Sequence, residues 1–279
     1  MAANIPEFVN ITSGELGALV DEFSDEGNYH YRIARNLVRY KDFNRALREI
    51  NRAVEKQPDN PDILLERGAL LYRMKKVDMA IRDFHKAIDI APEDYRGPFN
   101  LALAQEGIGN IDGALRSMNS AVTLKPDSVE ALSKRAMIKM KQDDTAGAIA
   151  DLNAAISLRP KMASLYNFRG DINSKENSIE SALADFKTAI ALNPQLGAAY
   201  LNRSYLYLSQ NDLILARRDL ESAKKYSPDA PLAAIIEAVL ALKTGTPQQG
   251  CKRLQTAQRG GHTQGYGRQI KQLIAKLCQ

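Results

Sequence analysis

Three histidines and two cysteines are the side chains in this sequence best suited to proton transfer, nucleophilic attack or metal binding. Catalysis requires such a group beside a partner, such as a base next to a nucleophile, a second carboxylate in the same cleft, or further metal ligands. His30, His85 and His262 are far apart and have no Cys or Asp pattern around them. We therefore predict surface or packing roles for the histidines, no catalytic residue and no enzymatic activity.

The two cysteines, Cys251 and Cys278, both lie in the last quarter of the sequence. No further Cys lies nearby, and His262 alone cannot complete a tetrahedral zinc site. The sequence therefore predicts no metal centre and no cofactor. Non-covalent binding by an extended surface is the chemistry that remains.

The composition favours packed helices. The chain has 279 residues, of which 44% are hydrophobic and 25% charged, as in a globular protein long enough to bury a core. Trp is absent, aromatic residues make up 6%, and Ala and Leu are abundant. Because such a composition suits helices that pack over small side chains, and argues against a β-sandwich, we expect an all-α fold.

No segment of the sequence is long and apolar enough to span a bilayer. The longest apolar run, residues 232–242, has about half the necessary length and is interrupted by Glu237. The start of the sequence lacks the basic and apolar regions of a secretory signal. The chain is therefore expected either in the cytoplasm or, as a mature form whose leader has been removed, in an exported location such as the periplasm.

Charge is distributed unevenly along the chain, whose net charge is +5. Residues 1–30 contain no Lys or Arg but carry the acids Glu7, Glu15, Asp21, Glu22, Asp25 and Glu26. Residues 243–279 contain no acid but carry the bases Lys243, Lys252, Arg253, Arg259, Arg268, Lys271 and Lys276. Since the middle is nearly balanced, nucleic-acid binding is not favoured. The opposite charges of the two ends leave head-to-tail self-association open.

A period of 34 residues organises most of the chain. Ala recurs at 46, 80, 114, 148, 182 and 216, and again at 53, 87, 121, 155, 189 and 223, while Pro recurs at 58, 92, 126, 160, 194 and 228. Self-similarity at a fixed period indicates a repeat architecture. We therefore divide the chain into six repeats: 27–60, 61–94, 95–128, 129–162, 163–196 and 197–230.

Each repeat combines small and large residues at fixed positions. The eighth position is always small (Ala34, Gly68, Ala102, Ala136, Gly170, Ser204), and the twentieth and twenty-seventh are always Ala. The twenty-fourth is always large and apolar (Ile50, Phe84, Met118, Leu152, Phe186, Leu220). This pattern predicts two closely packed helices, here called helix A and helix B, in which the large side chain fills the space beside the small ones.

Helix boundaries follow from capping residues. Short polar side chains occupy the sixteenth position of five repeats and predict the caps of helix B: Asp42, Asn110, Asp144, Ser178 and Asp212. The Pro at position 32 ends helix B. Asn60 followed by Pro61 is typical of the N-cap and first residue of the next helix A.

A pair of opposite charges also recurs within the repeats. Arg at the seventh position accompanies Asp at the twenty-third in four of them: Arg67 and Asp83, Arg135 and Asp151, Arg169 and Asp185, Arg203 and Asp219. Both are replaced in the third repeat, which has Leu101 and Ser117, and the first repeat has Ile33 and Glu49. We predict a salt bridge between helix A and helix B that fixes their register more than it adds stability.

This arrangement resembles the tetratricopeptide repeat (TPR) family, with a small eighth, Ala twentieth, bulky twenty-fourth, Ala twenty-seventh and Pro thirty-second residue. The resemblance covers 204 of 279 residues. It implies a right-handed α-α superhelical solenoid that acts as a non-enzymatic scaffold, with a groove for a protein or an extended peptide. One departure is Pro98 at the fourth position, usually a bulky aromatic, which predicts a late or irregular start of helix A in the third repeat.

The resemblance also implies which residues contact a partner. TPR ligands touch helix A mainly at the second, fifth, sixth, ninth, twelfth and thirteenth positions. On this chain the candidates are Tyr31, Arg32, Arg35, Arg39, Tyr72, Arg73, Phe99, Asn100, Lys134, Lys141, Asn167, Phe168, Asn202 and Tyr205. The alternative is a helix face that is merely solvated. The Lys and Asn pattern of TPR domains that clamp a chaperone's terminal carboxylate does not match here, so such a partner is not expected.

The two ends complete the predicted organisation. Residues 1–26 form an acidic segment, in which residues 9–23 suit a helix. Residues 231–262 resemble a degenerate seventh hairpin. Residues 263–279 suit a basic capping helix, whose apolar face includes Tyr266, Ile270 and Leu273. This C-terminal stretch is loosely similar to that of exported bacterial TPR proteins, in which two cysteines flank the same kind of segment. The similarity implies a Cys251–Cys278 disulfide, and two buried free thiols are the alternative.

Overall fold

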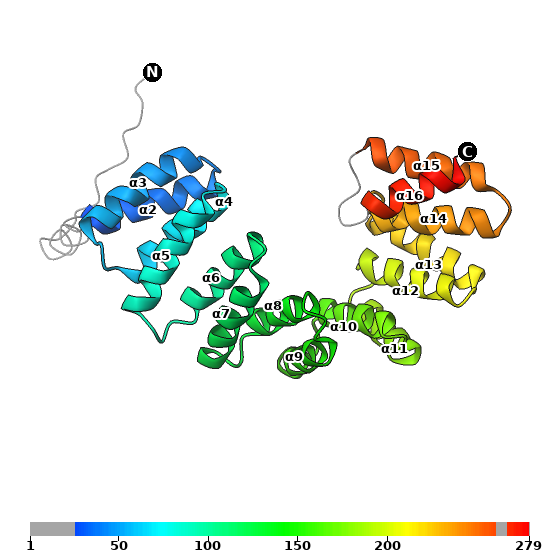
Figure 1. Ribbon diagram of the computed structural model, residues 1–279, viewed down its shortest axis with the longest axis horizontal. Coiled ribbons are helices and arrows are strands. Elements are labelled where there is room, and N and C mark those ends of the chain that lie inside the picture. Colours follow the sequence, from blue (N-terminus) through cyan, green and yellow to red (C-terminus); the bar gives the residue numbers. More distant parts are fainter. Residues whose placement is uncertain (1–25, 261–266, 279) are drawn as a thin grey trace, which may run out of the picture. The chain divides into compact units, whose positions relative to one another are not determined.

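The computed structural model describes residues 26–260 and 267–278 (Figure 1). These residues form helices joined by short connections, and no strand occurs among them. The predicted helix at residues 9–23 and Tyr266 of the predicted capping helix lie outside the described residues. The helices are α2 (Glu26–Arg39), α3 (Phe43–Lys56), α4 (Pro61–Arg73), α5 (Val77–Ile90), α6 (Arg96–Gly107), α7 (Ile111–Leu124), α8 (Val129–Met140), α9 (Thr145–Leu158), α10 (Ala163–Lys175), α11 (Ile179–Leu192), α12 (Gly197–Ser209), α13 (Leu213–Tyr226), α14 (Pro231–Lys243), α15 (Pro247–Arg259) and α16 (Gly267–Leu277).

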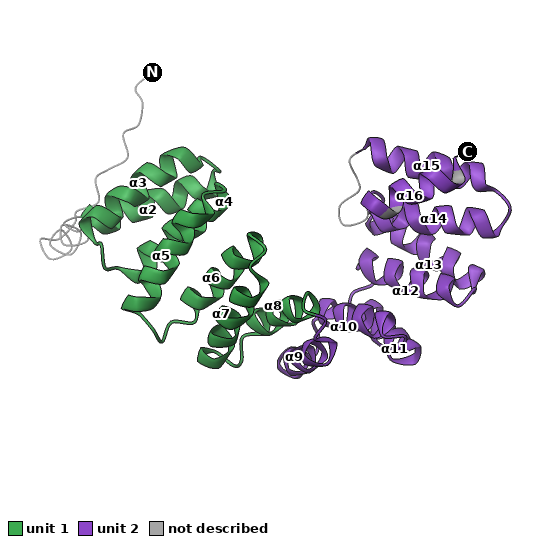
Figure 2. Cartoon of the chain, viewed as in Figure 1, with its two compact units in different colours: residues 1–142 green, residues 143–279 purple. Residues whose placement is uncertain are grey.

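The chain divides into two compact units, residues 1–142 and residues 143–279 (Figure 2). In the first, α2 packs on α3, α4 on α5, and α6 on α7 as antiparallel hairpins, and α8 follows against α7. In the second, the hairpins are α10 with α11, α12 with α13, and α14 with α15. Successive A helices are also in contact: α4 contacts α6, α10 contacts α12, and α12 contacts α14. None of the described helices is both long and apolar enough to cross a membrane.

Side-chain caps begin most of the B helices. The side chain of Asp42 accepts a hydrogen bond from the backbone amide of Arg45 at 3.2 Å, and Asn110, Asp144 and Asp212 accept in the same way three residues ahead. The predicted cap at Ser178 is wrong, because that side chain makes no such bond. Asn60 caps α4, whose first residue is Pro61, as predicted.

One backbone conformation recurs in every described hairpin turn. The fifteenth residue of each repeat, and its equivalent in the seventh hairpin, has a positive φ, between 58° and 80°. The residues are Lys41, Lys75, Gly109, Asp143, Asn177, Asn211 and Gly245. This left-handed conformation is unfavourable for most side chains, by about 1–2 kcal/mol. The turn geometry therefore costs more where Lys occupies the position than where Gly does.

The small eighth residue sets how closely helix A and helix B approach. A Cβ atom added at Gly68 would lie 2.5 Å from Cε1 of Phe84, and one added at Gly170 would lie 2.8 Å from Cε1 of Phe186. Both phenyl rings are almost fully buried. Where the eighth residue is Ala34, the twenty-fourth is the smaller Ile50. The two repeats with Phe are therefore the two that require Gly.

The third repeat begins irregularly, as its proline predicts. Helix α6 starts at Arg96, the second position of its repeat, whereas α4 starts at the first position. Its N-cap residue Tyr95 provides no side-chain cap, and the carboxylate of Asp94 instead accepts from the backbone amide of Arg96 at 2.9 Å. Pro98 stands in the first turn, where amide groups have no partner within the helix and a missing amide hydrogen costs nothing. Gly97 beside it is held close to α5, since an added Cβ would lie 2.7 Å from Cγ1 of Ile88.

Helix α16 covers the apolar surface at the end of the second compact unit. Ile270 of α16 is buried in a cluster with Leu254 of α15 and with Ile235 and Ala238 of α14. Leu273 is partly buried against the same cluster. The final helix therefore supplies apolar contacts that the seventh hairpin lacks on its own.

We predict that Gly68→Ala lowers the free energy of unfolding. Overpacking costs about 1–3 kcal/mol, and the better helix propensity of Ala offsets only about 1 kcal/mol of it. Adding Phe84→Leu should restore most of the loss, because the shorter side chain makes room for the methyl group. Chemical denaturation of the single and double variants measures this, and a Gly68→Ala variant as stable as the parent would contradict the close approach.

We also predict that Lys75→Gly raises the free energy of unfolding by roughly 0.5–1 kcal/mol, because Gly adopts the left-handed turn without steric cost. Gly109→Ala is the opposite control. Its φ is +80° and no atom lies within 4 Å of the added Cβ, so strain in the backbone is the main effect. In thermal denaturation the midpoint should rise for Lys75→Gly and fall for Gly109→Ala. Midpoints that shift in the same direction would exclude this explanation.

Candidate functional site

Partly buried ion pairs connect the two helices of a repeat. Arg67 of α4 donates from Nε and Nη2 to the two carboxylate oxygens of Asp83 on α5, at 2.8 and 2.7 Å. Arg169 bonds Asp185, and Arg203 bonds Asp219, with the same geometry. The hydrogen bonds to Asp219 raise the pKa of the Arg203 guanidinium above its ordinary value. These residues are occupied in the scaffold and are not free to contact a ligand.

The fourth expected pair, Arg135 with Asp151, joins residues of different compact units and stays a prediction. Two further hairpins contain related pairs. In the first repeat Ile33 occupies the seventh position, and Glu49 at the twenty-third instead accepts from His30, at the fourth position, at 2.7 Å. In the seventh hairpin the charges are exchanged, and Arg253 of α15 contacts Glu237 of α14 at 2.5 Å. This reversed pair was not predicted, although its separation of 16 residues equals that of Arg67 and Asp83.

A groove crosses three A helices of the second compact unit. It has a volume of about 430 Å³. Helix α10 contributes Asp171, Ser174 and Lys175, α12 contributes Asn202 and Tyr205, and α14 contributes Leu232 and Ile235. The groove therefore has a polar wall, a centre with an amide and a phenol, and an apolar wall.

Internal contacts hold the polar part of this groove in place. Asn202 donates from Nδ2 to Oδ1 of Asn167 on α10, at 3.1 Å. Lys175 Nζ lies 2.7 Å from Oδ2 of Asp171, so the two charges of the polar wall neutralise each other. Tyr205 is 50% exposed. An amide that keeps further donor and acceptor capacity beside an accessible aromatic ring suits contact with a peptide backbone.

Core packing supports the apolar wall. Ile235 belongs to the cluster that includes Ile270 of α16, and Leu232 belongs to a cluster with Leu201 and Leu220. Both wall residues keep less than a tenth of their surface exposed. The apolar wall is therefore held in place by packing against the hydrophobic core.

The structure places the residues predicted to bind a partner in three kinds of environment. Exposed residues are Arg32, Arg35, Arg39, Arg73, Lys141 and Tyr205; partly buried ones are Tyr31, Tyr72, Asn100, Lys134, Asn167, Phe168 and Asn202; Phe99 is buried. Of these, Asn202 and Tyr205 line the groove. The other lining residues were not among those predicted. Asp171, Ser174, Lys175, Leu232 and Ile235 stand at the helix A positions from which the candidates were drawn, whereas Phe186 stands at the twenty-fourth position, on helix B.

In the first compact unit, several predicted residues are engaged with neighbours. The guanidinium of Arg35 lies 5.7 Å from the ring centre of Tyr31, and Lys141 Nζ contacts Glu106 at 2.5 Å. Burial, followed by the nearby charge of Glu66, raises the pKa of Tyr31 above its ordinary value. These contacts fix the positions of side chains on the helix A surface.

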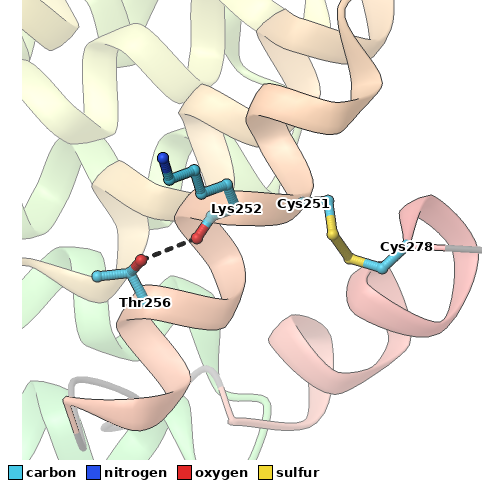
Figure 3. Close-up of a disulfide and its surroundings, with 4 residues drawn as sticks. All are labelled: Cys251, Lys252, Thr256 and Cys278. Atoms are coloured by element: carbon cyan, nitrogen blue, oxygen red, sulfur yellow. Dashed lines mark hydrogen bonds between the residues drawn. A yellow bond between two sulfur atoms is a disulfide. The ribbon is translucent and has the colours of Figure 1, made fainter.

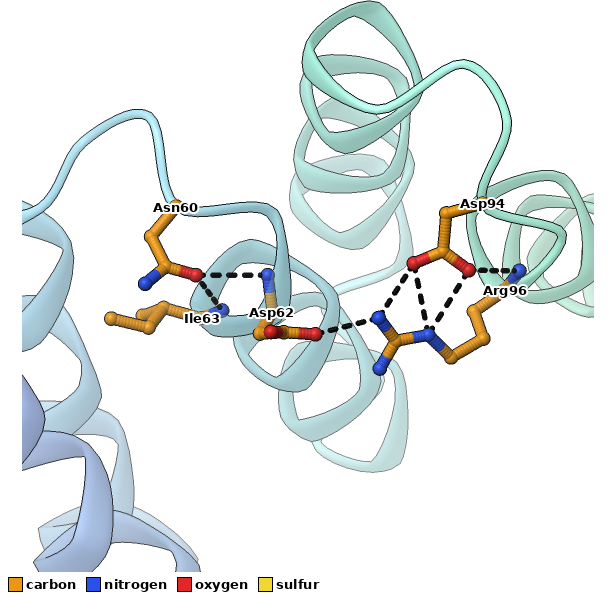
Figure 4. A network of polar contacts seen from close by, with 5 residues as sticks. All are labelled: Asn60, Asp62, Ile63, Asp94 and Arg96. Carbon is orange, nitrogen blue, oxygen red and sulfur yellow. Dashed lines mark hydrogen bonds and ion pairs between the residues drawn. The ribbon is translucent and has the colours of Figure 1, made fainter.

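Arg96 links successive A helices of this unit. It donates to the carboxylate of Asp94 at 2.6–3.0 Å, and its Nη2 lies 2.6 Å from Oδ1 of Asp62 on α4, whose first turn Asn60 caps (Figure 4). Although burial opposes the shift, the hydrogen bonds from Arg96 lower the pKa of Asp94 below its ordinary value. The charge of Arg96 is thus already compensated within the fold.

A disulfide fastens the final helix. Cys251 of α15 and Cys278, directly after α16, have an S–S distance of 2.05 Å and a Cα–Cα distance of 5.4 Å (Figure 3). Both cysteines pack against the cluster that contains Ile235, a residue of the groove wall. Of the two alternatives left by the sequence, the structure contains the disulfide. Among the described residues, no group of three or more His, Cys, Asp or Glu is placed to hold a metal ion.

These features define a class, the helical repeat proteins built from antiparallel hairpins. Residues 31–95, 99–163, 133–196 and 169–231 match the family model described as tetratricopeptide repeat. Because the matches cover more than half of the sequence, the chain belongs to the tetratricopeptide repeat family. No curated protein matches it.

Solved structures of other repeat proteins share this fold. A tetratricopeptide repeat protein from Parabacteroides merdae has a TM-score of 0.75 at 17% identity, with 91% of this chain and 99% of that chain covered. PilF of Pseudomonas aeruginosa has a TM-score of 0.65 at 14% identity, with 77% and 98% covered. YrrB, described as a TPR protein with an unusual peptide-binding site, has a TM-score of 0.55 at 16% identity, with 67% and 97% covered. The predicted all-α repeat fold is confirmed.

We predict that removing the disulfide loosens α16. The Cys251→Ser/Cys278→Ser variant should have a lower thermal midpoint, because closing a loop between residues 27 apart contributes about 3–4 kcal/mol. A reductant should lower the midpoint of the parent chain but not that of the variant. Mass spectrometry after thiol alkylation supplies the direct check, and two free thiols under oxidising conditions would exclude the bond.

Proposed function

We propose that this protein is a non-enzymatic scaffold that binds an extended segment of a protein or peptide in the groove of α10, α12 and α14. The observation that carries the proposal is the combination of Asn202 and Tyr205 between an apolar and a polar wall. In an extended segment, side chains alternate between two sides, so one set can meet Leu232 and Ile235 while the other remains near solvent. The amide of Asn202 can then bond the main chain between them.

The chemistry of the groove supports binding over catalysis. Its two charged side chains, Asp171 and Lys175, are bonded to each other. Neither is paired with a nucleophile, and Tyr205 is half-exposed to solvent. The family supports the same reading, because TPR proteins generally act as interaction scaffolds, and YrrB is described as having a peptide-binding site.

The same charges narrow the range of partners. A terminal carboxylate requires a cluster of cations, whereas the groove offers Lys175 alone, already neutralised by Asp171. We therefore propose an internal peptide segment as the ligand and not a chaperone tail. The disulfide favours an oxidising compartment, and hence the exported alternative, for this interaction.

Tyr205→Glu should weaken partner binding at least tenfold, because aromatic anchors in a groove commonly contribute more than about 1.4 kcal/mol. Tyr40→Glu is the matched control, since Tyr40 is 84% exposed and lies on the first compact unit. Proteins retained by the immobilised full chain are compared by quantitative mass spectrometry, and the main partner is then titrated by calorimetry. Equal binding by both variants would overturn the groove as the site.

A second candidate function is head-to-tail self-association. Helices α15 and α16 contain no acidic residue. Their exposed basic residues are Lys252, Arg259, Arg268, Lys271 and Lys276. Residues 1–25, outside the described structure, carry acids and no Lys or Arg. Attraction between such ends is screened over about 8 Å at physiological ionic strength. Light scattering should therefore detect oligomers at low salt that dissociate at high salt, and a monomer at both would rule this function out.

A further inference from the structure

A second cavity lies on the helix B side of the first compact unit, between α5, α6 and α7. Its volume is about 610 Å³. The apolar part includes Ile88 of α5, Pro98 and Leu101 of α6, and Leu124 of α7. The polar rim consists of His85, Arg116, Ser117, Asn119, Ser120 and Thr123. We call this space the third-repeat cleft.

The cleft is open because the third repeat lacks a bridge that other repeats have. In the second repeat, Arg67 spans three helices, since its guanidinium bonds Asp83 and also reaches Asn51 of α3 at 3.3 Å. In the fifth repeat, Arg169 likewise bonds Asp185, and it reaches Asn153 of α9 at 2.6 Å. A long, charged side chain therefore fills the space between two B helices.

All three positions of this bridge differ at the third repeat. His85 stands in place of Asn, Leu101 in place of Arg, and Ser117 in place of Asp. Ser117 instead donates to Gln105 Oε1 at 2.8 Å, a bond that lies within its own hairpin. No guanidinium crosses the cleft, whose apolar lining includes the partly buried Ile88 and Leu101, of which 5% is exposed.

The small residue at the fourth position of the third repeat widens the same cleft. In the fifth and sixth repeats it holds Tyr166 and Tyr200, whose rings lie 5.7 and 5.9 Å from the guanidinium carbons of Arg169 and Arg203. In the third repeat it holds Pro98, which is too small to replace an aromatic ring. The loss of the arginine and the loss of the ring thus coincide at one place.

The charges around the cleft define what it accepts. Arg116 is exposed, and the structure gives its side chain no carboxylate partner among the described residues. None of the described residues that line the cleft is Asp or Glu. A cationic side chain entering it would find no counter-ion, whereas a carboxylate near the rim can form a charge-assisted hydrogen bond with Arg116.

We propose that the third-repeat cleft is a second protein-binding site, which takes one bulky apolar side chain from a partner protein together with an adjacent carboxylate. The apolar side chain occupies the space that Arg fills in the second and fifth repeats, covering Leu101 and Ile88. The carboxylate pairs with Arg116 at the rim. This site belongs to helix B surfaces of the first compact unit, so it goes beyond the helix A groove proposed above.

Other repeats of the chain show which substitutions should test this site. Leu101→Arg with Ser117→Asp installs the pair found in the second, fifth and sixth repeats and should close the cleft while retaining the fold. The probe is a phage-displayed library of random dodecapeptides, selected on the full chain after depletion on this double variant. Enriched peptides should share a large apolar residue with Asp or Glu within two positions.

Calorimetry with an enriched synthetic peptide then separates the two sites. Arg116→Glu and the double variant should each weaken binding at least tenfold, whereas Tyr205→Glu in the other groove should change it less than twofold. Ser120→Tyr, at the exposed rim, blocks the entrance without touching the core and replaces the double variant if circular dichroism shows that variant to be unfolded. No enrichment, enrichment of basic peptides, or equal loss in Tyr205→Glu would overturn the proposal.

Discussion

The close approach of two helices at the small eighth residue is the contact on which the rest of the structure depends. At Gly68 and Gly170 there is no room for one methyl group, because a phenyl ring lies against the backbone. Packing between helices in turn sets the angle at which they cross. The α10, α12 and α14 groove borders this contact, since Phe186, whose ring packs against Gly170, also lines it.

Repetition separates what maintains the scaffold from what is available for recognition. The Arg–Asp bridge recurs with the same bidentate geometry in repeats far apart in the sequence, and its carboxylates are buried. Buried pairs of this kind specify register more than they stabilise. The two candidate binding surfaces include positions that depart from the repeat pattern. The third repeat lacks the bridge, and the α10, α12 and α14 groove joins an Asn and Tyr centre to an apolar wall from the degenerate seventh hairpin.

Much of the fold follows from the sequence alone, because its causes are tied to residue type. Ala, Gly and Pro at fixed positions predict the hairpins, and acidic or amide side chains predict five helix caps that form. The left-handed turn residues escaped notice since Lys, Asn, Asp and Gly all occupy that position. Leu232 and Ile235 were overlooked for another reason: an apolar residue on a helix indicates burial, and only the structure shows that the same atoms also border a groove. The exchanged pair of Glu237 and Arg253 was not predicted, because the recurring pattern of the other repeats has Arg before Asp.

A crystal structure of the full chain with a partner segment bound tests the central claim most directly. The account predicts an extended partner segment along α10, α12 and α14, with its main chain within hydrogen-bond distance of the Asn202 amide and an apolar side chain against Leu232. Density for the partner elsewhere, with this groove empty, would contradict the assignment of function to the A helices.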